Sequence, residues 1–132
     1  MTTQKSILTT SKLSIGYATK KSVTTIANNI NLNLEKGKLI SLIGANGIGK
    51  STLLRTLTGI QKPLLGEVYL NTKNIHQMDA LSLAKEMSLV LTEKLPPSNL
   101  TVFELIALGR QPYTNWIGKL TEEDVAKVNQ AM

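Results

Sequence analysis

The feature that most constrains this chain is a glycine-rich loop at residues 44–52, which read GANGIGKST. It fills the pattern G-x-x-x-x-G-K-[ST] of a phosphate-binding P-loop without a gap. Residues 39–43 before it (LISLI) predict a buried strand, and residues 52–58 after it (TLLRTLT) predict a helix. Because this motif requires a strand–loop–helix context, the segment predicts an α/β protein that binds a nucleoside triphosphate.

Each residue type in the loop has a physical reason. Glycines let the backbone wrap closely around a polyphosphate, so that backbone N–H groups and the positive end of the helix dipole point at the anion. Lys50 is then expected to reach the β- and γ-phosphates, and the Ser51 hydroxyl to ligate Mg²⁺. We therefore expect Lys50 to be catalytic as well as ligand-binding.

A P-loop does not hydrolyse a nucleotide alone, because the reaction also needs an acidic residue at the end of another apolar strand. Downstream, the sequence offers one such candidate, residues 89–93 (LVLTE), in which Thr92 separates the apolar run from Glu93. No Asp-Glu pair follows an apolar strand anywhere in the 132 residues. We therefore expect this chain to carry only the P-loop half of a catalytic unit.

Composition narrows the class of protein. Hydrophobic residues make up 42% of the chain, there is no cysteine, and no stretch approaches the roughly 18 apolar residues of a membrane-spanning helix. The first residues contain no apolar signal core, so export is not expected. The net charge of +6 comes from scattered lysines without interleaved aromatic residues, which favours a solvated surface over a nucleic-acid site.

Strand and helix signals alternate along the first part of the chain and then give way to helices. Gly59 is expected to end the P-loop helix, and residues 101–104 (TVFE) form a capping box that opens a helix ending at Gly109. Strands are predicted at 7–17, 23–26, 30–34, 66–70 and 87–91, with the second and third paired around an Asn28-Asn29 turn, and further helices at 80–86 and from Thr121. This order predicts a core over residues 1–98 and the start of a helical subdomain over 99–132.

The layout resembles the N-terminal half of an ATP-binding-cassette (ABC) ATPase over essentially the whole chain. An antiparallel leader precedes LEKGK and the P-loop strand, and the P-loop is followed by LTGI and GEVYL. Residues 100–113 (LTVFELIALGRQPY) are similar to the cassette subfamily that energises bacterial uptake of iron–siderophore complexes, haem and cobalamin.

The resemblance implies roles for individual residues. Tyr17 is at the place of the aromatic residue that stacks on adenine, and the phosphate cradle corresponds to Asn46 and the backbone of residues 47–52, with Gly47, Gly49, Lys50, Ser51 and Thr52 as ligands. Thr92 stands where cassettes usually carry a Gln that contacts Mg²⁺ and water, and Glu93 beside it is an alternative metal ligand. His76 is not at the place of the family's switch histidine. Tyr113 and Trp116 lie where a membrane partner would dock, or are packing residues.

The implied function is that of an ATP-binding importer subunit, with ATP and Mg²⁺ as cofactors. Its expected partners are a second cassette and transmembrane permease subunits, without nucleic acid, at the cytoplasmic face of the cell membrane. Two alternatives remain open at this point. The first is another P-loop phosphotransferase, although this sequence contains no Asn-Lys-x-Asp motif for reading guanine. The second is a non-catalytic nucleotide-binding fragment. The isolated 132 residues are expected to be marginally stable and inactive.

Overall fold

A computed structural model describes residues 6–90, 99–115 and 117–132. The chain divides into two compact units, Met1–Asp79 and Ala80–Met132. The sequence predicts a different kind of boundary, between the nucleotide-binding core and a helical subdomain, after residue 98. That division stays a prediction. Among the described residues, no helix combines the length and apolarity that crossing a bilayer requires.

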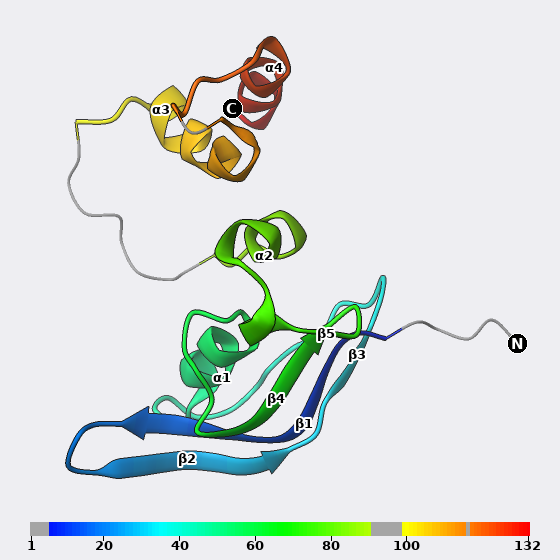
Figure 1. Ribbon diagram of the computed structural model, residues 1–132, viewed down its shortest axis with the longest axis vertical. Coiled ribbons are helices and arrows are strands. Elements are labelled where there is room, and N and C mark those ends of the chain that lie inside the picture. The colour runs from blue at the N-terminus through cyan, green and yellow to red at the C-terminus, as the bar shows by residue number, and fades with distance from the viewer. Residues whose placement is uncertain (1–5, 91–98, 116) are drawn as a thin grey trace, which may run out of the picture. The chain divides into compact units, whose positions relative to one another are not determined.

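The first unit is built on an antiparallel five-stranded sheet (Figure 1). β1 (Ser6–Ala18) is its long central strand, with β4 (Leu65–Leu70) on one edge and β5 (Lys73–Asn74) beyond it. β2 (Val23–Ile30) and β3 (Asn33–Glu35) both pair with β1. The short 3₁₀ helix η1 (Ile75–Gln77) follows β5.

The predicted pairing of the second and third strands with each other is wrong. Leu8 of β1 pairs with Leu34 of β3 on one edge and with Leu70 of β4 on the other, so β2 and β3 follow one another along the same edge of β1. The cause lies upstream, where a tight turn closed by a 2.8 Å bond from the Thr19 N–H to the Ser22 carbonyl returns the chain onto β1. The antiparallel leader is therefore a sheet centred on β1.

The core of this unit lies between the sheet and helix α1 (Lys50–Leu57). Leu13, Ile15, Val68 and Ile75 are at most 2% exposed, and Thr56 of α1 is fully buried. The buried Thr56 hydroxyl donates a hydrogen bond to the Thr52 carbonyl of the same helix at 2.8 Å. Gly59 has φ 77° and follows the C-cap Thr58, as predicted for the end of the P-loop helix.

The strand predicted at residues 39–43 is not formed. Leu39 and Ile43 are 97% and 90% exposed, and the segment pairs with none of the described strands. A strand preceding a P-loop is stable when neighbours supply hydrogen bonds and cover both faces. Within the described residues no strand takes that place, so the apolar pattern has nothing to pack against.

The second unit contains helices α2 (Ala80–Glu86), α3 (Val102–Ala107) and α4 (Glu122–Ala131) and the 3₁₀ helix η2 (Leu108–Tyr113). Both predicted helix starts are confirmed as capping boxes, Thr101 with Glu104 and Thr121 with Asp124. The helix expected to end at Gly109 is shorter, because α3 passes into η2, which contains Pro112. Residues 87–90 form no strand, and residue 91 lies outside the described residues.

One ion pair joins η2 to α4 in this unit. Arg110 donates from Nε to Asp124 Oδ1 at 2.8 Å, and its terminal nitrogen lies 2.7 Å from the same oxygen. The guanidinium carbon also lies 4.1 Å from the centre of the Tyr113 ring, and Lys85 of α2 approaches the same ring at 5.7 Å. These contacts hold the helices of the unit together where few apolar side chains are buried.

Candidate functional site

The P-loop and the end of β1 enclose a cavity of about 380 Å³. The seven residues predicted to bind nucleotide all line it, together with one residue that the sequence did not indicate: Tyr17, Asn46, Gly47, Gly49, Lys50, Ser51, Thr52 and Ile26. The structure thus brings an aromatic residue of the leader sheet to the phosphate-binding motif, which begins 27 residues further along the chain. The role of each residue remains a proposal.

Helix α1 begins inside this cavity. Its N-cap is Gly49, with φ 109°, and Gly47 also has a positive φ of 82°. A Cβ atom on Gly49 would collide with Cγ2 of Ile26, so the loop can follow this path only with glycine at that position. The first N–H groups of a helix have no partner within it, which leaves a set of donors at the mouth of the cavity for an anion.

Lys50 lies across the loop. Its Nζ donates to the carbonyl oxygens of Gly44 at 2.7 Å and Ala45 at 2.8 Å. An ammonium group has three donors, so a third remains for an incoming phosphate oxygen. Because the ammonium is already held by two loop carbonyls, its position in the cavity is defined before any ligand arrives.

Tyr17 provides the aromatic wall of the cavity. Its side chain is half exposed, and its hydroxyl lies 3.0 Å from Oγ1 of Thr52 in the first turn of α1. An aromatic ring with one open face near an anion site can stack on a nucleobase, an interaction worth about 1–3 kcal/mol per base in other proteins. Thr52 itself is 5% exposed, so its hydroxyl links the ring to the helix.

One hydroxyl of the cavity is placed where it would ligate a divalent cation bound beside a polyphosphate. The side chain of Ser51 is exposed at the start of α1 and would supply one hydroxyl ligand. Elsewhere in the described part of the chain, no three His, Asp or Glu side chains come together as a metal site. The remaining candidates for metal binding, Thr92 and Glu93, lie outside the described residues, as does Trp116.

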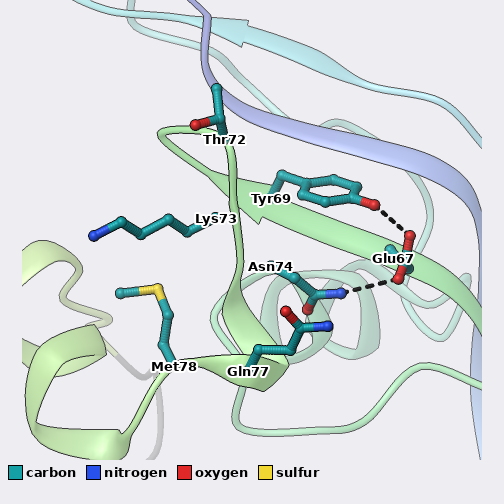
Figure 2. Close-up of a pocket in the computed structure, with 7 residues that line it drawn as sticks. All are labelled: Glu67, Tyr69, Thr72, Lys73, Asn74, Gln77 and Met78. Carbon is teal, nitrogen blue, oxygen red and sulfur yellow. Dashed lines mark hydrogen bonds between the residues drawn. The ribbon is translucent and has the colours of Figure 1, made fainter.

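A larger cavity, of about 470 Å³, lies on the β4–β5 hairpin (Figure 2). Its carboxylate, Glu67, accepts one hydrogen bond from the Tyr69 hydroxyl and another from Asn74 Nδ2 at 3.0 Å, as the dashed lines in Figure 2 show. The Glu67 bond raises the pKa of Tyr69 above its ordinary value. The one carboxylate of this cavity is therefore already bonded to two of its neighbours, and the P-loop cavity, with its helix N-terminus, is the better candidate despite its smaller volume.

His76 does not belong to either cavity. It lies in η1, where partial burial and the nearby charge of Lys62 both lower its pKa, burial being the larger cause. A neutral imidazole next to a lysine does not resemble a metal-binding or catalytic arrangement. This agrees with the sequence, in which no second ligand flanks His76.

Comparison with known proteins identifies the family that the P-loop and the chain layout indicated. The family model described as "ABC transporter" matches residues 27–132. The chain is 47% identical to an uncharacterized ABC transporter ATP-binding protein of Methanocaldococcus jannaschii, over 89% of this chain and 39% of the relative. It is 42% identical to an achromobactin transport ATP-binding protein of Dickeya dadantii (95% and 45% covered) and 42% identical to an iron(3+)-hydroxamate import ATP-binding protein of Bacillus subtilis (89% and 42% covered).

Solved structures extend the likeness to the fold. A bacterial ABC transporter cassette solved as a dimer superposes with a TM-score of 0.73 at 26% identity, covering 92% of this chain and 53% of that one. A nucleotide-free ATP-binding cassette from an ABC transporter gives 0.72 at 28% identity, covering 96% and 52%. The predicted fold class, a P-loop ABC ATPase core with an antiparallel leader, is confirmed.

The chain spans less than half the length of these curated relatives. The matched family model nevertheless includes the P-loop and the helical unit, and the two solved structures cover 92% and 96% of this chain. On the matched family model and on these relatives, the chain belongs to the ABC transporter family.

Proposed function

We propose that this chain forms the nucleotide-binding part of the ATP-binding subunit of an ABC importer for an iron–siderophore, haem or cobalamin-type substrate. The observation that carries the proposal is the single cavity shared by Tyr17 and the N-terminus of α1. Relatives named for achromobactin transport and for iron(3+)-hydroxamate import support the importer class and the type of cargo.

Different residues bind the base and the phosphates of ATP. Tyr17 stacks on adenine, while Asn46, the backbone of residues 47–52 and Lys50 hold the phosphates. The Ser51 hydroxyl would hold Mg²⁺, which would supply positive charge beside the phosphates. Thr92 or Glu93, just after the apolar run at 89–91, takes the place of the Gln that contacts metal and water in most cassettes.

The partners follow from the class of protein. With a second cassette and transmembrane permease subunits as partners, the protein would lie peripherally, at the cytoplasmic face of the cell membrane. The second unit offers an apolar cavity of about 340 Å³ between α3 and the segment before α4, lined among others by Leu100, Phe103, Ala107 and Leu120. Such an apolar surface on the helical subdomain suits a permease helix.

The test compares one lysine of the P-loop cavity with one lysine of the hairpin cavity. Lys50→Ala removes a charge-assisted contact worth about 1.5–3 kcal/mol, so ATP should bind roughly ten- to a hundredfold more weakly. Lys73→Ala, in the hairpin cavity, should leave the affinity unchanged. Titration calorimetry measures the ATP affinity of both variants, each made in the full protein that the gene encodes.

The opposite pattern would refute the site. If Lys73→Ala weakened ATP binding and Lys50→Ala did not, the nucleotide would belong to the hairpin cavity. If ATP bound well but the protein as its gene encodes it released no phosphate, the function would be nucleotide binding without catalysis.

A further inference from the structure

Gln61 makes a contact that neither the P-loop motif nor the family resemblance assigns. Its side-chain Nε2 donates to the carbonyl oxygen of Gly16 at 2.6 Å, across 45 residues of sequence. Gly16 directly precedes Tyr17 at the end of β1. The donor therefore acts on the peptide that carries the aromatic ring of the nucleotide cavity.

The backbone of Gln61 is itself fixed to the P-loop helix. Its N–H donates to the Arg55 carbonyl in the last turn of α1 at 3.0 Å, after Gly59 has turned the chain with its positive φ. The side chain thus reaches from the C-terminal end of α1 to β1. A part-buried bond between two anchored backbones holds them at one separation.

A second bond joins the same dipeptide to the other end of the helix. The Tyr17 hydroxyl lies 3.0 Å from Oγ1 of Thr52, in the first turn of α1. Gly16 and Tyr17 are therefore attached to α1 at both ends, through Gln61 beyond its C-terminus and through Thr52 near its N-terminus. The ring is held relative to the helix whose N-terminus faces the phosphates.

The backbone of Gly16 also lies close to β2. A Cβ atom there would collide with the Thr24 carbonyl oxygen of β2 and lie 2.8 Å from Cδ1 of Leu64. The path of the chain into Tyr17 is therefore set by two contacts, one with β2 and one with Gln61. Removing the Gln61 donor would release one of them.

We propose that Gln61 is a positioning residue for nucleotide recognition, which holds the Gly16–Tyr17 peptide against α1 and so sets the reach between the base-stacking ring and the phosphate loop. The inference rests on the proposed function of the cavity. It separates the two halves of the ligand: Gln61 should matter for a nucleotide, which bridges ring and loop, and not for an inorganic triphosphate, which touches the loop alone.

The experiment measures the affinities of ATP, ADP and inorganic triphosphate for the protein as its gene encodes it. Gln61→Met keeps the length of the side chain without its donor, and should weaken ATP and ADP about two- to tenfold while triphosphate is unchanged. Gln77→Met, a glutamine on η1 outside the P-loop cavity, is the matched control and should change none of the three.

A double-mutant cycle tests whether Gln61 acts through the ring. In a Tyr17→Ala background, Gln61→Met should have no further effect on ATP affinity, because nothing remains to be positioned. A full additional loss in that background would overturn the proposal. Equal weakening of ATP and triphosphate by Gln61→Met would also overturn it, because it would show a loosened P-loop instead of a misplaced ring.

The measurements on the Lys50 and Gln61 variants distinguish a failure of this inference from a failure of the proposed function. If triphosphate binding is insensitive to Lys50→Ala, the assignment of the cavity fails and the inference fails with it. If triphosphate and ATP both depend on Lys50 and Gln61→Met changes neither, the cavity stands and only the positioning role is refuted.

Discussion

Two apolar segments of the first unit, Leu65–Leu70 and residues 39–43, share a strand-like composition but differ in structure. The first is β4, in which Val68 is 0% and Leu70 5% exposed. The second forms no strand, and its Leu39 and Ile43 are 97% and 90% exposed. Both segments run directly into a turn or loop. Residues 39–43 contain no charged residue, and β4 contains one, Glu67.

The difference lies in what each segment finds beside it. β4 pairs with β1 on one edge and with β5 on the other, and Val68 is buried where the sheet meets its core. Residues 39–43 have no such neighbour among the described strands. An apolar side chain contributes about 1.5–3 kcal/mol only when it is buried, so a strand pattern is stable where other strands cover it.

The largest expected effect tests this contrast with the same substitution at two leucines. Leu13→Ala, at a fully buried position of β1, should lower the free energy of unfolding of the 132-residue chain by about 2–5 kcal/mol. Leu39→Ala should change it by less than about 0.5 kcal/mol, because nothing covers that side chain. Urea denaturation followed by circular dichroism measures both.

The comparison breaks if the two substitutions cost the same. A loss of more than about 1 kcal/mol for Leu39→Ala would mean that residues 39–43 are buried in solution. In that case the P-loop strand forms within these 132 residues, and the predicted strand would be right after all.

Local signals in the sequence predicted local structure well. The capping boxes at Thr101 and Thr121 and the glycine that ends α1 are decided within one helical turn, and all are confirmed. The pairing of β2 and β3 and the state of residues 39–43 depend on which strand lies alongside, and both expectations were wrong. Periodicity reports what a segment can bury, and the partner that buries it is set elsewhere in the chain.

The candidate site shows the same division. The motif named Lys50 and its neighbours, and the family resemblance named Tyr17, but no pattern indicated Ile26 or Gln61. Ile26 is one apolar residue of an alternating strand, and Gln61 is a polar residue after a helix, so neither differs from a surface position in sequence. Their contacts across the fold, at Gly49 and Gly16, exist only once β1, β2 and α1 are assembled.

A smaller effect should separate two glycines that both have positive φ. Gly66 in β4 has φ 79°, and a Cβ there would collide with the Lys12 carbonyl oxygen and lie 2.5 Å from that of Ser11. Gly37, with φ 77°, has nothing within 4 Å in the part of the chain that the structure describes. Gly37→Ala should cost about 1–2 kcal/mol for backbone strain alone, and Gly66→Ala about 1–3 kcal/mol more for the collision.

Thermal unfolding of the two variants measures the difference. Equal shifts in Tm would show that β4 can move away from β1 at this point without loss. That result would weaken the view that the sheet is the fixed part of the unit and that residues 39–43, which pair with none of the described strands, are not.

The smallest effect extends the contrast to the second unit. There, one capping carboxylate also binds a side chain of another element, whereas the hydrogen bonds of the other are to the residue that opens its own helix. Asp124 is buried, caps α4 through Thr121 and accepts from Arg110 of η2. The hydrogen bonds from Thr121, followed by the one from Arg110, lower the pKa of Asp124 from its ordinary 3.8 to about 2. Glu104 is capped only through Thr101, which also lowers its pKa.

Because the pKa of Asp124 is lower in the folded state than in the unfolded chain, its carboxylate stabilises the fold above about pH 4. That contribution should be lost as the pH falls from about 4 to about 2, where the folded protein also takes up the proton. Asp124→Asn should remove this part of the pH dependence, and Glu104→Gln should remove less, since its box lies on the surface and involves one helix. Helical circular dichroism during urea unfolding at pH 5, 4, 3 and 2 follows both variants. If Glu104→Gln flattened the pH profile as much as Asp124→Asn, the contact with Arg110 would add nothing, and the neighbour from η2 would not be what stabilises the start of α4.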